Sequence, residues 1–369
     1  IVQKKLGKLE AAEKSYKKTI ELKPSYAEAH NNLGIVQKKL GKLEAAEKSY
    51  KKAIEIAPGY AEAHNNLGLT LQLLNKLEEA KISFKKAITL KPHFAGAHFA
   101  LGSKLFDLGK FEEAEFFYKN ILKAYPKHPE ANHNLGILFV LLNRLEDSLP
   151  YLKKAVEIKP NREMFWLSYS QTLNDLKQYE ESLTVIKKAI KLKPNFAEAH
   201  YNFATSLLRL GRFLEAEGRF KKAIEIKPEY PQAHNDLGSV QYKLEKFEKA
   251  EVSLKRAIEL KPQYPGSYLS LALTLKELGK LDEAQLSFEK TIKLNPGFVE
   301  AYFHLGVLLK ETRRLKDAED NFKKTIVLKP DFIEAHNKLG DTFKEQGKLN
   351  EAKISYKKAI ELKLAKKVQ

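Results

Sequence analysis

Cysteine is absent from this 369-residue chain, and methionine and tryptophan each occur once. Without cysteine, the chain has no disulfide bonds, no thiolate metal ligands and no cysteine nucleophile. No run of about 18 apolar residues exists, which excludes a membrane-spanning helix. The sequence also lacks a glycine-rich phosphate loop, an HExxH pair and a nucleophile-plus-base arrangement. We therefore expect no enzymatic activity, no cofactor and no bound metal.

Proline, by contrast, recurs at a fixed spacing of 34 residues without insertion or deletion. It occurs at Pro24, Pro58, Pro92, Pro126, Pro160, Pro194, Pro228, Pro262, Pro296 and Pro330. A constant period of this length indicates one structural unit copied along the chain. A chain built in this way offers surfaces more readily than a catalytic pocket.

Residues 27–60 serve as the reference copy, and positions are counted from Ala27. Apolar and small residues recur at three- and four-residue steps before Gly41 and again after it, which predicts two helices joined by a short turn. Pro58 ends the second helix. The eighth position is usually glycine, as in Gly34, although glycine inside a helix costs about 1 kcal/mol relative to alanine. Its recurrence predicts the close approach of a neighbouring helix.

These features resemble the tetratricopeptide repeat: the period, the Leu-Gly pair, a small residue at position twenty, an aromatic residue at twenty-four, alanine at twenty-seven and proline at thirty-two. The resemblance implies an all-α fold, a right-handed superhelical solenoid of about ten helix-turn-helix units plus a partial N-terminal unit. First helices would line a concave groove, and second helices would form the outer wall. We divide the chain into a partial unit (residues 1–26), ten units in one continuous solenoid (27–366) and a short basic tail (367–369).

The charge is strongly basic, because 65 lysines and arginines exceed 47 acidic residues by 18. Much of this excess lies in lysine doublets on the predicted second helices, as at Lys51 and Lys52. Pairs such as Glu47 and Lys51, spaced by four residues, are ordinary intrahelical partners. We interpret the doublets as a solvated outer face. A nucleic-acid partner is not expected, because single-strand binding also needs aromatic residues interleaved with the charge, and the stripe of doublets has none.

Residues that differ from copy to copy should carry the function, and we expect them on the groove side. The sixth position carries Asn32, Asn66, Asn134 and Asn202, followed by Asp236. This run resembles the asparagine ladder in the superhelix of O-linked N-acetylglucosamine transferase, which implies that the amides hold the backbone of an extended peptide. An amide donates and accepts at the same time, which suits such binding. The alternative is that asparagine here caps or solvates a helix.

Apolar and aromatic residues occupy other groove positions in the middle of the chain. They include Phe99, Phe106, Tyr201, Tyr242 and Phe303, whereas the groove positions near both ends are polar. A partner helix or an extended hydrophobic segment would fill such a lining. Alternatively, these side chains pack against the neighbouring first helix.

Two other groups of residues give local predictions. Histidines occupy the fourth position of several copies, as at His30 and His64. Successive copies are too far apart for two of these side chains to share one metal ion, because metal–nitrogen bonds are about 2 Å long. We therefore interpret them as packing residues.

Pro150 falls inside a predicted second helix, where proline costs roughly 3 kcal/mol. A kink or change of superhelical pitch near residues 146–170 is one expectation, and a bend absorbed on the outer face is the other.

Three functions fit the sequence. We favour a non-enzymatic scaffold that binds a protein or peptide ligand in the concave groove. A second is a structural protein that stacks head to tail into a fibre through uncapped ends, and a third is the targeting arm of a larger glycosyltransferase-type protein. Ile1 aligns with Ile35 in the middle of a first helix, which suggests that the natural start lies upstream. The compartment is not fixed, and the cytoplasm is the default assignment.

Overall fold

The computed structural model describes residues 2–368, and these residues form 21 α-helices and no strand. Within this range, every helix is too short or too polar to span a bilayer. The helices are α1 (Val2–Leu22), α2 (Ala27–Lys39), α3 (Leu43–Ile56), α4 (Ala61–Leu73), α5 (Leu77–Leu90), α6 (Ala95–Asp107), α7 (Phe111–Ala124), α8 (Pro129–Leu141), α9 (Leu145–Ile158), α10 (Glu163–Asp175), α11 (Tyr179–Leu192), α12 (Ala197–Arg209), α13 (Phe213–Ile226), α14 (Pro231–Lys243), α15 (Phe247–Leu260), α16 (Pro265–Glu277), α17 (Leu281–Leu294), α18 (Val299–Glu311), α19 (Leu315–Leu328), α20 (Ile333–Glu345) and α21 (Leu349–Val368).

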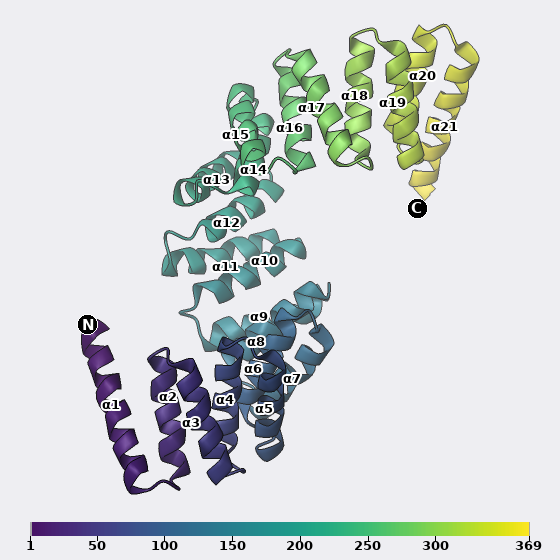
Figure 1. Ribbon diagram of the computed structural model, residues 1–369. Helices are drawn as coiled ribbons and strands as arrows, with labels where there is room; N and C mark the ends of the chain where they lie inside the picture. Colours follow the sequence, from purple (N-terminus) through teal and green to yellow (C-terminus); the bar gives the residue numbers. More distant parts are fainter. Residues whose placement is uncertain (1, 369) are drawn as a thin grey trace. The chain divides into compact units, whose positions relative to one another are not determined.

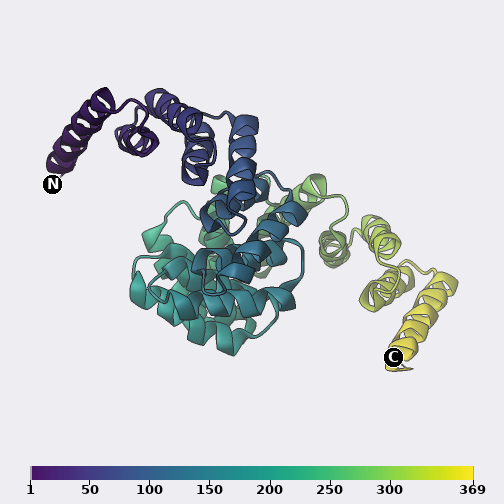
Figure 2. The ribbon, with the colours of Figure 1, turned by 90° about the horizontal axis from the view of Figure 1, so that it is seen from below.

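The 34-residue copies appear as helix pairs, as the sequence predicts. The first helix of each copy has 13 residues, from α2 to α20, and the second has 14 residues from α3 to α19. Most of these pairs can be followed in Figure 1 and Figure 2. We number the copies 1 to 10 from Ala27, so that copy 1 contains α2 and α3, and copy 10 contains α20 and α21.

The turn inside each copy is made by one residue with a left-handed backbone at the fifteenth position. In copy 1 this is Gly41, with φ of 76°. The Gly41 N–H donates to the Lys38 carbonyl at 3.1 Å and the Lys42 N–H to the Gln37 carbonyl at 2.9 Å. This pattern satisfies carbonyls left open at the helix end. Glycine adopts the conformation without strain, which is why the turn falls where the sequence predicts it.

The glycine of the eighth position allows the two helices of a copy to touch. A Cβ atom on Gly238 would lie 2.5 Å from Leu254 Cγ, and one on Gly68 would lie 2.6 Å from the Phe84 ring. Such distances leave no room for a side chain. The predicted close approach is therefore confirmed, and the contact is with the second helix of the same copy. Phe84 is fully buried at this contact, a burial that contributes about 2 to 3 kcal/mol for a large apolar side chain.

The chain divides into two compact units, with the boundary in the sequence between Lys177 and Gln178. The N-terminal unit contains α1 to α10, and the C-terminal unit contains α11 to α21. In both units each second helix packs on the first helix of its own copy or of the next one, as α3 does on α2 and α4. The division of the sequence into residues 1–26, 27–366 and 367–369 stays a prediction.

Both terminal helices differ from the pattern of the copies. α1 continues through Gly7, although Gly7 corresponds to the turn residue Gly41. α21 extends to Val368, six residues beyond the point where the other second helices end. Leu364 stands where Pro330 ends the preceding copy, so no proline terminates this helix. The predicted basic tail is helical up to Val368, and residue 369 lies outside the described range.

Pro150 lies within α9, which runs without interruption from Leu145 to Ile158. Its ring is exposed on the surface of the helix. Ser148, two residues earlier, is buried and donates its hydroxyl proton to the Leu145 carbonyl at 2.9 Å. Proline is therefore accommodated without breaking the helix. A change of pitch near residues 146–170 stays a prediction.

Candidate functional site

The candidate site lies on the first-helix side of each unit, which we call the inner face. Consecutive first helices contact each other directly, as α2 contacts α4 and α4 contacts α6 in the N-terminal unit, and as α14 contacts α16 in the C-terminal unit. Second helices of successive copies show no comparable contact among the described residues. The first helices are thus closer together than the second helices, which makes their side the concave one within each unit.

The predicted asparagine ladder is interrupted by bonds between neighbouring side chains. Asn66 Nδ2 donates to Asn31 Oδ1 at 3.0 Å, across two copies. Asn32 Oδ1 accepts from Asn31 at 3.5 Å, a weak contact. Asn134 Nδ2 donates to the Tyr118 hydroxyl at 3.2 Å. An amide has capacity beyond one such bond, so Asn66 and Asn134 keep further donors and acceptors.

Asn202 and Asp236 lie in the C-terminal unit. Asn202 is buried, with 5% of its surface exposed, and its backbone carbonyl accepts from Ser206 Oγ at 3.1 Å. Asp236 accepts from the Tyr201 hydroxyl at 2.7 Å and from Asn235 Nδ2 at 2.9 Å. Burial raises the pKa of Asp236 despite these two hydrogen bonds. Burial, followed by the Asp236 charge, also raises the pKa of Tyr201. Tyr201 and Asp236 are thus brought together.

The aromatic residues of the inner face are half-buried. In the N-terminal unit, Phe99 stacks on His128 with 5.6 Å between ring centroids, and Phe106 meets the edge of Phe111 at 5.7 Å. Both phenylalanines pack against the core of the unit. In the C-terminal unit, Phe303 lies 4.9 Å from the Phe332 ring. The alternative of packing within the stack therefore accounts for part of each side chain.

Leucines at the thirteenth position are far more exposed than these aromatic residues. Leu73 at the end of α4 has 63% of its surface exposed, and Leu141 at the end of α8 has 54%. Both lie on the inner face of the N-terminal unit. The sequence places both leucines among the apolar groove positions, but it does not indicate that they are more exposed than the aromatic residues.

The same positions carry polar pairs in the C-terminal unit. Lys276 Nζ lies 2.9 Å from Glu311, and Lys310 forms the corresponding pair with Glu345. The Tyr242 hydroxyl donates to Glu277 at 3.4 Å. Each bond joins the twelfth position of one copy to the thirteenth position of the next. The spacing of 35 residues is the signal that sequence reasoning missed.

The fourth-position histidines do more than pack. His98 Nε2 lies 2.8 Å from the Pro92 carbonyl oxygen, and His200 Nε2 lies 3.0 Å from that of Pro194. A carbonyl oxygen only accepts, so Nε2 carries the proton and donates. Trp166 donates to the Pro160 carbonyl in the same way, at 2.8 Å. The interpretation as packing residues was therefore incomplete. Within residues 2–368, no three His, Cys, Asp or Glu side chains form a group that could hold a metal.

Acidic residues of the second helices join neighbouring copies. The predicted intrahelical pair of Glu47 and Lys51 is present at 2.6 Å, and Lys76 of the next copy lies 2.9 Å from the same carboxylate. Glu47 is only 7% exposed. The hydrogen bond from Lys51, opposed by burial and assisted by Lys76, lowers the pKa of Glu47. Only the intrahelical half of this arrangement was predicted.

The outer face is less purely charged than the sequence suggested. Phe116 on α7 is 61% exposed, three residues before Lys119, in a copy that has no lysine doublet. Ile82 on α5 and Leu286 on α17 are similarly exposed, at 67% and 65%. These side chains share one position on their second helices. The prediction that nucleic acid is not a partner stays a prediction.

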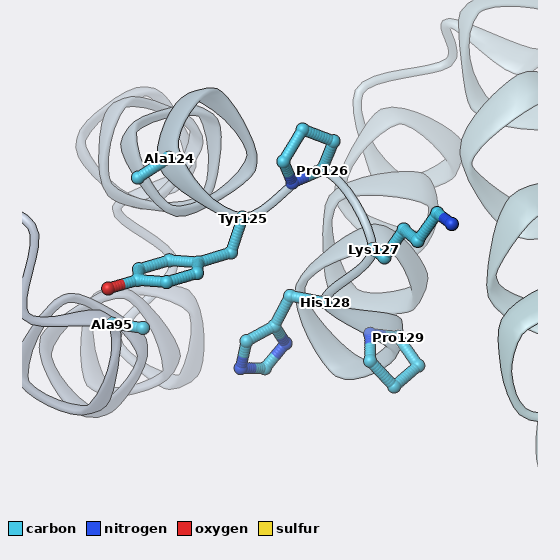
Figure 3. Close-up of a pocket in the computed structure, with 7 residues that line it drawn as sticks. All are labelled: Ala95, Ala124, Tyr125, Pro126, Lys127, His128 and Pro129. Atoms are coloured by element: carbon cyan, nitrogen blue, oxygen red, sulfur yellow. The ribbon is translucent and has the colours of Figure 1, made fainter.

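A hollow of about 590 Å³ lies where copy 3 meets copy 4. Its lining consists of Ala95, Ala124, Tyr125, Pro126, Lys127, His128 and Pro129. Figure 3 shows the side chains of Tyr125 and His128 directed into the same space, near Ala95 at the start of α6. His128 belongs to both surfaces, because its ring also stacks on Phe99 of the inner face. The hollow therefore adjoins the inner face of the N-terminal unit.

Several family models match the chain, and all of them describe the same repeat. A model described as TPR repeat matches residues 3–41 and 171–211. Models described as tetratricopeptide repeat match residues 27–60 and 61–94, 105–172, 195–263, 269–331, and 333–366. Together these matches cover nearly the whole chain. No curated protein matches.

Solved structures similar to this chain cover about half of it. The crystal structure of MamA is 25% identical, covers 45% of this chain and 97% of its own, and has a TM-score of 0.43. The crystal structure of YrrB, described as a TPR protein with an unusual peptide-binding site, is 26% identical. It covers 50% of this chain and 95% of its own, with a TM-score of 0.44.

Proposed function

Because the chain belongs to the tetratricopeptide-repeat family of protein-interaction scaffolds, we propose that the inner face of its N-terminal unit binds an apolar segment of a partner protein. One observation supports this choice above others. Leu73 and Leu141 are more than half exposed at the same position of two first helices, α4 and α8. On the helix between them, α6, the aromatic residues Phe99 and Phe106 are only half-buried.

The energetics favour a partner at this place. Exposed apolar groups on a concave surface are typical of interaction sites. Neither leucine is covered by its own unit, so their exposure contributes little to the fold. Fully burying a leucine side chain contributes about 1.5 to 3 kcal/mol. A partner segment that covers Leu73 and Leu141 would therefore gain a substantial part of the free energy that a specific complex needs.

The amides beside this surface suit the backbone of an extended segment. Asn66 uses one side-chain hydrogen bond within the unit, to Asn31, whereas Asn134 bonds to the Tyr118 hydroxyl and, through Oδ1, to His133 Nδ1 at 3.3 Å. Their remaining donors and acceptors would meet peptide groups of the partner. We assign the same role to Asn32. Binding along the C-terminal unit, at Tyr201, Asn202, Asp236, Tyr242 and Phe303, is a weaker proposal because Asn202 is buried and Asp236 is already hydrogen-bonded.

The test uses peptides selected on the protein itself from a displayed library of random 12-residue sequences. The dissociation constants of the selected peptides would be measured by fluorescence anisotropy for the wild type, Leu141→Asp and Ile82→Asp. Ile82 is a matched control, because it is equally apolar and 67% exposed but lies on the second helix α5. We expect at least a tenfold loss for Leu141→Asp and less than a twofold change for Ile82→Asp. Equal effects of the two variants would refute the proposal.

Head-to-tail stacking remains a second candidate, favoured by the exposure of two side chains on α21. Ile360 and Leu364 are each 59% exposed, whereas Ile326, at the same position as Ile360 in the preceding copy, is half-buried. A second copy of the chain would cover them. Sedimentation at increasing concentration should show growth in size that Ile360→Asp abolishes, and a constant size would remove this candidate. No observation among the described residues favours the targeting arm of a glycosyltransferase-type protein.

A further inference from the structure

The outer face of copy 6 departs from the pattern of the other copies. Gly218 lies in the interior of α13, at the twenty-second position, where no other copy has glycine. A Cβ atom on Gly218 would lie more than 4 Å from every neighbouring helix of the described range. Unlike Gly68 and Gly238, this glycine is therefore not required by a close contact. Because glycine weakens a helix interior relative to alanine, packing within the chain does not explain it.

Two cations reach one aromatic ring beside this glycine. Arg219 follows Gly218 on α13, and its guanidinium carbon lies 4.5 Å from the centre of the Phe203 ring on α12. Lys187 of α11 reaches the same ring, with 6.0 Å between Nζ and the ring centre. This is possible because α11 and α13 both pack on α12. Among the described residues, neither Arg219 nor Lys187 forms an ion pair.

The arginine and the ring occur together only in copy 6. Arg219 occupies the twenty-third position, where five copies have serine, and Phe203 occupies the seventh position, where eight copies have leucine. A planar guanidinium group that stacks on a ring keeps its N–H groups available at its edge. Arg219 is half-buried in this contact. The ring therefore holds a charged donor group next to the open surface of Gly218.

The acidic residues nearby do not balance this positive charge. Glu215 accepts two hydrogen bonds from Arg212, at 2.7 and 2.8 Å. The hydrogen bond from Arg212 lowers the pKa of Glu215 most, and the charges of Arg212, Arg219 and Lys187 lower it further. Glu180 also attracts Arg212. Arg219 and Lys187 thus keep N–H donors for another carboxylate, a group that the guanidinium fork matches in shape.

An exposed leucine extends this surface by one helical turn. Leu214 precedes Gly218 by four residues, so the two share one face of α13, and 70% of Leu214 is exposed. Seven of the other nine copies have an acidic residue at this position, which would repel a carboxylate. Single-stranded nucleic acid needs exposed rings for stacking, but Phe203 is buried. The observations therefore favour a protein segment over nucleic acid.

We propose that the outer face of copy 6 binds a segment of a partner protein that carries an acidic residue. The carboxylate meets Arg219 and Lys187. The backbone of the segment crosses α13 at Gly218, where a larger side chain would prevent its approach, and an apolar side chain of the segment contacts Leu214. This surface belongs to second helices of the C-terminal unit, so the inference does not depend on the function proposed for the inner face.

The test follows binding at Gly218 itself, by NMR on the full chain with isotope-labelled glycine. The signal that is missing from the Gly218→Ala variant is that of Gly218. Blocked peptides of glycine and serine carry Leu-Gly-Glu or Leu-Gly-Gln at their centre. We expect the Glu peptide to shift the Gly218 signal with at least fivefold higher affinity than the Gln peptide, and to leave the Gly96 signal unchanged. Equal effects of the two peptides, or a shift caused only by an oligothymidine strand, would overturn the proposal.

The matched variants introduce residues that copy 7 has at the same positions. These are Gly218→Val, after Val252, and Arg219→Ser, after Ser253. We expect both to keep the circular dichroism spectrum of the wild type and to weaken the Glu peptide at least fivefold, as measured by saturation-transfer NMR on the peptide. Arg256→Gln, which removes an exposed cation from α15, is the control and should change the affinity less than twofold. Unchanged binding in either folded variant would contradict the proposal.

Discussion

The two units have similar helix pairs but treat the same two positions of the inner face differently. In the C-terminal unit, the twelfth and thirteenth positions of successive copies are joined by Lys276 with Glu311 and by Lys310 with Glu345. In the N-terminal unit, the corresponding residues include Lys38 and Leu73, and no acidic partner for Lys38 lies within the described residues. Burial, and secondarily the charge of Lys39, lowers the pKa of Lys38.

This comparison shows how one scaffold provides two kinds of surface. Where the twelfth and thirteenth positions pair with each other, their charges are already compensated and cover the apolar parts of the helices. Where they do not pair, exposed leucine and a partly buried ammonium group remain. A surface of the second kind is the better place for a partner with apolar and acidic groups. The following predictions test whether the pairing itself makes this difference.

Leu73→Glu should have the largest effect, because it gives Lys38 the partner that Lys276 has in Glu311. We expect about a 30-fold loss of affinity for peptides selected on the wild type, which corresponds to about 2 kcal/mol. Fluorescence anisotropy measures this loss, and thermal unfolding should show no decrease in stability. Ile82→Glu on the outer face is the control. An affinity within twofold of the wild type would show that the pairing does not determine binding.

Acid should weaken a contact that both units share, the bridging of successive copies by a buried glutamate. In the C-terminal unit, Glu319 lies 2.8 Å from Lys348 of the next copy, in addition to its pair with Lys323. Burial alone would raise the pKa of Glu319, but hydrogen bonds from these lysines lower it from its ordinary value of 4.5 to about 2. The folded state therefore binds protons less readily than the unfolded chain, and the contribution is present above about pH 4.5 and is lost as the pH falls toward 2.

We expect Glu319→Gln to reduce the free energy of unfolding by about 1 to 2 kcal/mol at pH 7, since the carboxylate is largely buried and its loss leaves two lysines unpaired. Urea denaturation between pH 7 and pH 2.5 measures the difference from the wild type. That difference should shrink below pH 4.5. Glu259→Gln serves as the control, because the Glu259 side chain is 63% exposed and pairs with Arg256 of the same helix. A pH-independent difference would contradict the assigned cause.

The sequence predicted the helix pairs because their boundaries depend on local chemistry. Pro58 ends a helix wherever it occurs, and Gly41 adopts a left-handed turn without strain. The contact of Gly68 with Phe84 was also predictable as a close approach, since both residues belong to one copy. Gly7 is an exception, because it corresponds to Gly41 but lies inside α1.

The inner face was predicted less well because its contacts cross from one copy to the next. The bond between Tyr201 and Asp236 depends on how two copies stack, which the sequence of either copy does not reveal. Phe99 and Leu73 looked equivalent as apolar groove residues, yet the first is half-buried against its own unit and the second is mostly exposed. The hollow at Tyr125 was missed for a different reason: its lining comes from the place where copy 3 meets copy 4, which the sequence of neither copy reveals by itself.

The units also differ in the residues that make their turns, and this predicts a stabilising change. In the N-terminal unit the left-handed residues include Asn75 and Asn143 besides Lys177, whereas in the C-terminal unit those other than glycine are Glu245, with φ of 56°, and Arg313. Asparagine tolerates this region, but other side chains cost about 1 to 2 kcal/mol there. Glu245→Gly should therefore raise the free energy of urea unfolding by about 1 kcal/mol. The control Asn75→Gly should have a smaller effect, and a loss of stability in Glu245→Gly would show that the turn is not strained.

The smallest effect should come from giving the C-terminal unit, at the twelfth and thirteenth positions, the combination of residues found in the N-terminal unit. Glu311 is half-exposed in its pair with Lys276, and pairs at such sites contribute between about 0 and 1 kcal/mol. Glu311→Leu should therefore change the free energy of unfolding by less than about 0.5 kcal/mol. It should also create the combination of lysine and exposed leucine found at Lys38 and Leu73, and raise the affinity of peptides selected on the wild type by about twofold. Unchanged affinity in a folded variant would mean that one such pair of positions does not suffice, and that Phe99 and Phe106 on α6 are needed beside it.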